Sequence, residues 1–166
     1  YSNVLFRDGS YSGTGGWRGW SRLPTNFTAK ELGGIVQYNV GLPYDALEII
    51  ARGADDHVYT NVLFRDGSYS GTGGWRGWAE IPTPFTAKTL GGLAQYRGTG
   101  NPYDGFEIFA TDANNAVYSN VLFRDGSYRD TGGWRGWAKL PSNFTAKQMG
   151  DVTRYGVGGV YSMLEI

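Results

Sequence analysis

Three sets of aromatic and charged residues recur along this sequence with the same residue types in the same order. Each set contains an aspartate, a tyrosine, two tryptophans and an arginine that follows the first tryptophan. The sets are Asp8, Tyr11, Trp17, Arg18 and Trp20; Asp66, Tyr69, Trp75, Arg76 and Trp78; and Asp125, Tyr128, Trp134, Arg135 and Trp137. An aromatic ring packs well on the apolar C–H face of a sugar, and a charged group fixes sugar hydroxyls by hydrogen bonds. The sets therefore predict repeated sites for a carbohydrate ligand.

The same residues also have a purely structural interpretation. In a strand, the side chains of Trp17 and Trp20 point to opposite faces, so one of the two is expected to pack in the core. Asp8 and Gly9 are a typical turn pair, and Arg7 is compatible with a solvated or ion-paired charge. The sequence leaves the ligand site and the packing motif open as alternatives.

Catalysis, a cofactor and a bound metal are not expected. His57 is the single histidine and cysteine is absent, which excludes a Ser-His-Asp set in every repeat, a histidine cluster for zinc and a thiolate metal site. Carboxylates such as Asp8 and Glu48 recur in three copies, whereas a catalytic pair needs two different environments. The cluster Gly13–Gly16 is expected to form a turn, because no Lys-Ser/Thr pair and no helix follow it.

The composition is that of a glycine-rich and aromatic-rich β protein. Glycine accounts for 27 of 166 residues, and the chain contains 6 Trp and 12 Tyr, a combination typical of aromatic strands joined by glycine turns. Lys and Arg total 15, as do Asp and Glu. Neither nucleic acid nor an anionic membrane is an expected partner, because both favour a basic excess. No apolar run approaches the ~20 residues that span a bilayer.

The three sets belong to a longer internal repeat. The segment Asn3–Tyr11 returns unchanged at Asn61–Tyr69 and at Asn120–Tyr128, with offsets of 58 and 59 residues. We place the repeats at about residues 1–58, 59–117 and 118–166 of a single domain. The half that carries the sets is nearly identical between copies, while the other half differs at most positions. Function, gene conversion or design would each keep one half fixed in this way.

Each repeat is expected to contain four strands. One full unit reads as strands Gly34–Tyr38, Leu47–Arg52, Val58–Arg65 and Trp75–Ile81. A turn is expected at Asp55-Asp56, and no segment has convincing helical periodicity. Four strands per repeat are typical of a β-propeller blade. The predicted fold class is therefore all-β, with three four-stranded antiparallel blades per chain; a β-trefoil is the alternative.

The two ends of the sequence correspond to complementary parts of one repeat. Tyr1 aligns with Tyr59 in the third strand, and Leu164–Ile166 aligns with Leu47–Ile49 in the second. Propellers typically have four to eight blades, so three blades would leave strand edges open to pairing with another chain. We expect a homodimer with six blades, in which the N-terminal strand of one chain completes the last repeat of its neighbour. A fragment of a longer propeller is the alternative.

Two motifs resemble those of the bacterial PLL-type lectins. Leu47–Asp56 and Phe106–Asn115 are similar to the L-E-V-F-A-R-G-A-D-N stretch of that family's blades. The spacing of Trp17, Trp20 and Leu23 is similar to the W-x-x-W motif of the same family, with its leucine three residues on. The resemblance touches all three copies and covers under half of each. It implies a β-propeller lectin that binds fucose or related O-methylated glycans at repeated sites between blades.

Overall fold

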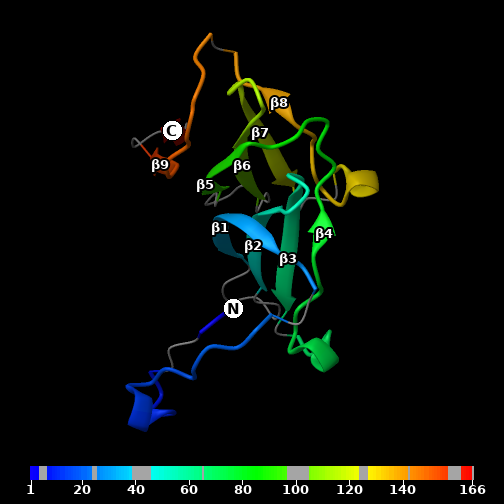
Figure 1. Ribbon diagram of the computed structural model, residues 1–166. Helices are drawn as coiled ribbons and strands as arrows, with labels where there is room; N and C mark the ends of the chain where they lie inside the picture. The colour runs from blue at the N-terminus through cyan, green and yellow to red at the C-terminus, as the bar shows by residue number, and fades with distance from the viewer. Residues whose placement is uncertain are drawn as a thin grey trace.

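A computed structural model gives the fold of the chain. It describes residues 1–3, 7–23, 26–38, 46–64, 66–96, 105–123, 127–141, 143–156 and 162–165. Figure 1 shows that these residues form strands and loops almost throughout, with the strands gathered into successive sheets.

The first sheet is an antiparallel meander of four strands. In sheet order these are β1 (Ala29–Tyr38), β2 (Ala46–Gly53), β3 (Val58–Phe64) and β4 (Ala79–Glu80). Apolar and β-branched residues are frequent in β2 and β3 and suit a pleated, largely buried surface. The turn between these two strands holds Asp56 at a φ of 66°, which aspartate tolerates better than most residues. The turn predicted at Asp55-Asp56 is confirmed.

The second sheet repeats this meander. Its strands are β5 (Thr89–Tyr96), β6 (Gly105–Thr111), β7 (Val117–Phe123) and β8 (Ala138–Lys139). The β6–β7 turn holds Asn115 at a φ of 64°, in the position of Asp56. A third sheet pairs β9 (Thr153–Gly156) with β10 (Ser162–Glu165). The predicted all-β class is confirmed, as are four antiparallel strands in each of the first two sheets.

The fourth strand is shorter than the sequence predicts. The expected strand runs from Trp75 to Ile81, but β4 covers only Ala79–Glu80, and Trp75 makes a single bridge to Leu63. Gly77 lies between the bridge and the strand with a φ of 103°, a backbone conformation that interrupts a regular strand. The first strand is longer than predicted, because β1 begins at Ala29 and accommodates two irregularities of register.

Helical structure in the described residues is limited to three 3-10 turns. These are η1 (Ser12–Thr14), η2 (Ser70–Thr72) and η3 (Arg129–Thr131), one in each copy of the nearly identical half-repeat. Each lies in the loop that leads toward the fourth strand. None of the helical segments in this part of the chain has the length and apolar character needed to cross a membrane.

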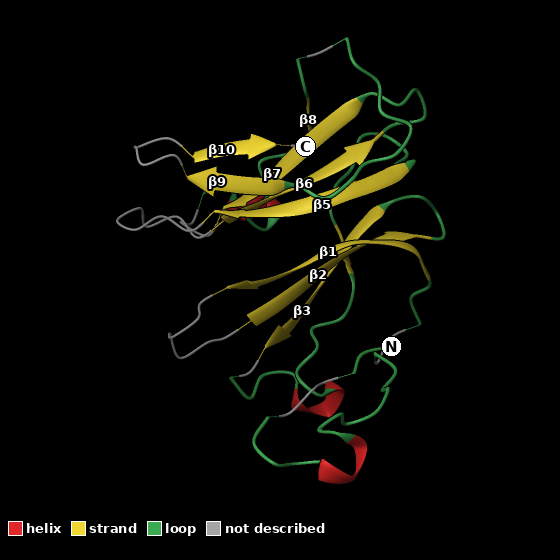
Figure 2. Cartoon of the chain, turned by 90° about the vertical axis from the view of Figure 1, so that its left-hand side faces the viewer, coloured by secondary structure: helices red, strands yellow, loops and turns green. Residues whose placement is uncertain are grey.

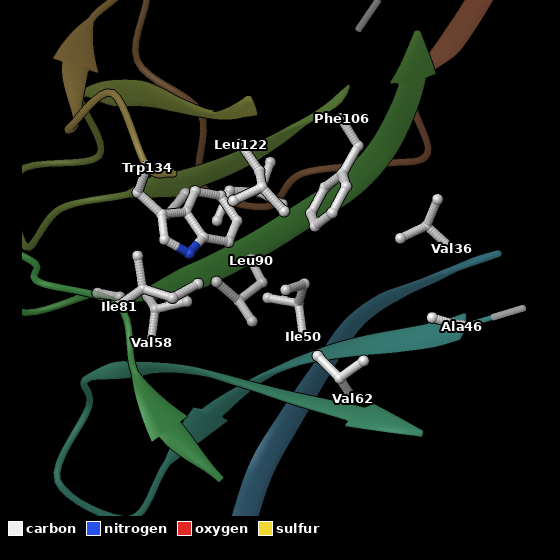
Figure 3. Packing of buried hydrophobic residues seen from close by; sticks show 13 residues of the cluster. Val36, Ala46, Ile50, Val58, Val62, Ile81, Leu90, Phe106, Leu122 and Trp134 are labelled. Atoms are coloured by element: carbon white, nitrogen blue, oxygen red, sulfur yellow. The ribbon is translucent and has the colours of Figure 1, made fainter. Parts of the chain in front are cut away.

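The two four-stranded sheets pack against each other around a shared hydrophobic core. Figure 3 shows Ile50 and Val62 of the first sheet in one cluster with Phe106 and Trp134 of the second. Strand β1 lies beside β5. A Cβ atom added at Gly33 of β1 would lie 2.9 Å from Cδ1 of Leu90. Glycine at this position therefore allows the two strands to approach closely.

The three sheets are stacked one after another along the molecule. Figure 2 shows β9 and β10 at one end, then the second sheet, then the first, with the N-terminus at the opposite end. There, Ser2 and Ser21 exchange two backbone hydrogen bonds of 2.8 Å. Thr60 and Ala79 are paired at the equivalent register of the first sheet. The N-terminal segment thus has the arrangement of the third and fourth strands of a repeat.

Candidate functional site

The loop between the third and fourth strands begins with a turn closed by an aspartate. In the second copy, the Asp66 carboxylate accepts hydrogen bonds from the Ser68 hydroxyl and, at 2.8 Å, from the Ser68 backbone N–H. These bonds, the hydroxyl first, hold the pKa of Asp66 below its ordinary value. Asp8 accepts the same backbone bond from Ser10 at 2.9 Å. The aspartates are ionised residues that shape the start of the loop; Asp125 lies outside the described residues.

A tyrosine in the left-handed backbone region follows this turn in every copy. The φ angles of Tyr11, Tyr69 and Tyr128 are 54°, 54° and 53°, a conformation that bulky residues rarely adopt. Such a conformation persists only where the surrounding structure enforces it. Its recurrence in all three loops makes it a property of the repeat.

Hydrogen bonds to its carbonyl hold this tyrosine in place. The Tyr69 carbonyl accepts bonds of 2.9 Å from the backbone N–H groups of Thr72 and Gly74. The Thr72 hydroxyl lies 2.9 Å from the same carbonyl and 2.5 Å from that of Trp75. The threonine hydroxyls of the other two copies lie at similar distances from the equivalent carbonyls. The loop is therefore closed by its own backbone and by one threonine.

All three tyrosine rings are accessible, and two of them stack on a phenylalanine. Tyr11, Tyr69 and Tyr128 are 49%, 47% and 47% exposed. The Tyr69 ring stacks on Phe64 with centroids 5.6 Å apart, and the Tyr128 ring stacks on Phe123 at 5.5 Å. One side of each of these rings is thus occupied by phenylalanine, while about half of the side chain faces solvent. An aromatic surface fixed in this way suits the C–H face of a sugar.

The tryptophans have a different role in the two complete sheets. Trp75 and Trp134 are buried, and Trp134 meets Phe106 edge to face with centroids 5.5 Å apart. Trp78 and Trp137 are half-buried against phenylalanine rings that precede the sheets. The equivalent tryptophans of the N-terminal segment, Trp17 and Trp20, are both exposed. Wherever the sheet is complete, the structure places both tryptophans in packing contacts, the first buried and the second half-buried.

The arginines lie against the third strand. Nη2 of Arg76 lies 3.4 Å from the Thr60 carbonyl, and Nη2 of Arg135 lies 3.5 Å from the Ser119 carbonyl. Arg18 has its Nη2 at 3.4 Å from the Ser2 hydroxyl. The predicted site residues therefore separate into two groups. Aspartate and tyrosine shape the exposed loop, while tryptophan and arginine tie the loop to the sheet.

Two residue types that the sequence did not single out organise the same region. The first is the threonine that closes the loop. The second is an asparagine of the third strand: the side-chain oxygens of Asn61 and Asn120 accept bonds of 3.0 Å from the backbone N–H groups of Gly77 and Gly136. Both asparagines are fully buried. Their identity in all three copies was the available signal, but identity alone does not distinguish a ligand contact from a structural bond.

A large apolar groove lies between the N-terminal segment and the first sheet. Its volume is about 1030 Å³. Its lining includes Trp17 and Trp20 of the N-terminal segment and Leu32, Ile35 and Trp75 of the first sheet and its loop. We call the three loops that hold Tyr11, Tyr69 and Tyr128 the tyrosine loops. The groove differs from them in being lined mainly by apolar side chains.

Comparisons with known proteins leave the geometry as the main guide to function. No protein-family model and no curated protein matches this chain. Within the described ranges, no group of three or more histidine, aspartate or glutamate side chains could hold a metal ion. The exposed tyrosine loop, repeated three times, is the candidate binding site that this geometry favours.

Proposed function

We propose that this chain is a multivalent carbohydrate-binding protein of the lectin type, with one site at each tyrosine loop. The observation that carries the proposal is the exposed tyrosine held at the same left-handed φ in all three copies. A strained backbone that is kept three times over is a common mark of a functional position. Weak single sites repeated on one molecule gain avidity when they engage a multivalent surface.

The loop has the features that sugar recognition requires. Its aromatic ring offers an apolar surface, and the ionised aspartate and the serine hydroxyl beside it offer hydrogen-bond partners. Internal hydrogen bonds fix the loop before any ligand arrives, which reduces the ordering cost of binding. The resemblance to PLL-type lectins supports fucose or related O-methylated glycans as the first candidates.

We further propose that the stacked sheets are blades of a β-propeller. Each complete sheet is a four-stranded meander, and the first strands β1, β5 and β9 are neighbours in chain order. Every strand pair in the described residues joins strands that are consecutive along the chain. This pattern favours blades over a β-trefoil, in which strands of different repeats would share one barrel.

A glycan array probed with the whole labelled chain tests the proposed function. We expect selective binding to fucosylated or O-methylated glycans. The triple variant Tyr11→Ala/Tyr69→Ala/Tyr128→Ala should lose this binding and keep its circular dichroism spectrum. The matched variant with phenylalanine at all three positions should retain most of it, because the ring remains. Binding that survives the alanine variant would exclude the tyrosine loops, and no binding by the wild-type chain would exclude a lectin.

A second candidate function is a structural propeller scaffold without a ligand. The burial of Trp75 and Trp134 favours it, because core packing alone would keep this part of the repeat constant. Replacing these tryptophans is therefore a poor test of sugar binding, since loss of a buried aromatic costs about 3–5 kcal/mol of stability. The tyrosine variants separate the two candidates, because a scaffold predicts no array signal for any of them.

A further inference from the structure

The outer face of the first sheet exposes apolar side chains whose counterparts in the second sheet are covered. Leu90 is 5% exposed, and both it and Leu93 pack on the backbone of β1 at residues 33–34. One repeat earlier, the equivalent positions are Leu32 and Ile35, which are 68% and 63% exposed. A contiguous exposed apolar patch of this kind marks an interaction site.

A cluster of three aromatic rings accompanies each complete sheet. The clusters are Phe27, Tyr59 and Trp78 in the first sheet and Phe85, Tyr118 and Trp137 in the second. In both, the phenylalanine comes from the segment that precedes the sheet, and its centroid lies 4.2 to 5.4 Å from each partner ring. All six side chains are half-buried. The phenylalanine thus connects the segment before a sheet to the third and fourth strands of that sheet.

The three residues at the corresponding positions that belong to neither complete sheet are all exposed. Phe144 precedes β9 and is 70% exposed, while Tyr1 and Trp20 in the N-terminal segment are 80% and 74% exposed. They carry the same residue types, in the same repeat positions, as the two formed clusters. Phe144 could therefore form a third cluster with Tyr1 and Trp20, although the three rings do not pack together in this chain.

The geometry of the stack keeps these residues apart within one molecule. Tyr1 and Trp20 line the apolar groove beside the first sheet, together with Leu32 and Ile35. Phe144 lies in the segment that leads to β9, and Figure 2 places β9 and β10 at the far end of the stack. The described residues pair no third strand with β10, and they pair no second strand with Ser2. The two ends of the stack are thus complementary surfaces.

We propose that a second copy of this chain docks head to tail in the apolar groove. Phe144 of one copy packs on Tyr1 and Trp20 of the partner subunit, forming the third aromatic cluster. Leu32 and Ile35 of the partner subunit pack on the segment that leads to β9, at Gly150, as Leu90 packs on β1. A Cβ atom added at Gly150 would meet no heavy atom within 4 Å. This inference rests on the blade arrangement proposed above and adds the contacts through which the second copy docks.

The two existing sheet interfaces are the reason to choose a second copy over another partner. The groove presents Leu32, Ile35 and Trp75, at the positions by which Leu90, Leu93 and Trp134 meet a preceding sheet of this same chain. A sheet of the same repeat is the surface that already covers these positions in the second sheet. A head-to-tail contact forms a ring if the rotation closes, and two chains would contribute six sheets, within the range of known propellers.

Size-exclusion chromatography with light scattering on the whole chain tests the proposal. The chain has a mass of 18.2 kDa, and we expect the wild-type protein to elute as a dimer of twice that mass. Phe144→Ala and Trp20→Ala should each weaken association by about tenfold or more, as expected for a buried interface aromatic. Tyr128→Ala, which removes an exposed aromatic ring outside the groove, is the matched control and should leave the mass unchanged.

Mixing the two interface variants tests the head-to-tail geometry. A Phe144→Ala copy still has an intact Trp20, and a Trp20→Ala copy still has an intact Phe144. The mixture can therefore form one complete aromatic cluster and should associate more strongly than either variant alone. Equal association of the mixture and the separate variants would overturn the head-to-tail contact.

The outcomes also separate this inference from the proposed function. A wild-type chain that stays at 18.2 kDa at high concentration would overturn the second copy as partner. A dimer that is unaffected by Phe144→Ala and Trp20→Ala would overturn the aromatic contact. Glycan binding is measured independently on the array, at the Tyr69 and Tyr128 side chains, neither of which lines the groove. A monomer that binds glycans would thus contradict the docking proposal alone.

Discussion

The aromatic residues of the repeated sets have different roles according to their position in the repeat. Tyr69 and Trp75 are six positions apart in the sequence, yet the tyrosine is half-exposed on a closed loop and the tryptophan is buried. The loop places them differently: hydrogen bonds to the Tyr69 carbonyl hold the tyrosine in the exposed turn, and the chain then returns to the sheet at Trp75. At this scale, composition alone predicts the ligand chemistry but not which aromatic residue is available for it.

The third loop provides a natural variation at the proposed site. Arg129 and Asp130 stand where the other copies have serine and glycine. If the loop contacts the glycan, the third site should differ from the other two in affinity, since two charged groups are added beside Tyr128. The double change Arg129→Ser/Asp130→Gly should bring its affinity to that of the second site. Binding measured on variants that keep one tyrosine loop each would check this, and identical affinities before and after the change would contradict it.

A hydrogen bond at the edge of the first sheet predicts a pH dependence of stability. The Tyr59 hydroxyl donates to Asp55 at 2.7 Å. This bond holds the pKa of Asp55 below its ordinary value of 3.8 and, as the largest cause, raises the pKa of Tyr59 to about 12. The aspartate contribution is present above pH 3.8 and is lost as the pH falls through the lowered pKa. The tyrosine contribution is present below pH 10.0 and is lost as the pH rises toward 12.

The variant Tyr59→Phe should therefore be less stable than the wild type at neutral pH. The difference should shrink at acid pH, once Asp55 is protonated in both proteins. Urea unfolding at a series of pH values measures it. Tyr118→Phe is the matched control, because its hydroxyl lies 3.4 Å from Asp112 and its loss should matter less. A stability difference that stays constant between about pH 7 and about pH 3 would contradict this assignment.

At the scale of the element, the tyrosine loop is a rigid connector whose glycines are not equivalent. Gly74 has a φ of 89°, and a Cβ atom there would lie 2.5 Å from the Phe64 carbonyl oxygen. Gly71 has open space around it. The first position needs glycine for both backbone conformation and close approach, whereas the second has no such requirement.

A pair of alanine substitutions tests this difference. Gly74→Ala should lower the free energy of unfolding by about 1–3 kcal/mol, because it forces a strained backbone against a neighbouring carbonyl. Gly71→Ala should change it by less than about 0.5 kcal/mol, as for an ordinary surface substitution. Thermal or urea unfolding measures both. Similar values for the two variants would show that the loop is not held as described.

The strands were more predictable than the loop that joins them. Strands β2 and β3 follow from apolar and β-branched runs bounded by the Asp55-Asp56 turn, and the same pattern predicts β6 and β7. The fourth strand could not be delimited, because Gly77 interrupts it at a position where the sequence still resembles a strand. The sequence also did not predict that the tyrosine has a positive φ and an exposed ring, because no neighbouring residue indicates this conformation at a tyrosine.

The whole molecule is a stack of similar sheets with unlike ends. The repeat itself, the all-β class and the two four-stranded sheets follow from the sequence, because each copy contains the same turns and apolar runs. The exposure of Leu32 and Phe144, compared with their covered counterparts, could be seen only in three dimensions. It is the comparison between copies that supports the proposed second chain, since each repeat serves as a control for the others.

Counting glycan sites per chain is the most direct test of these proposals. Isothermal titration calorimetry would use the glycan that binds best on the array, with the wild-type chain and with Tyr69→Ala. We predict about three sites per chain for the wild type, one per tyrosine loop, and the loss of one site in the variant. Identical titration curves for the wild type and Tyr69→Ala would contradict the assignment of binding to the repeated loop. So would a wild-type chain with a single site that Tyr69→Ala retains.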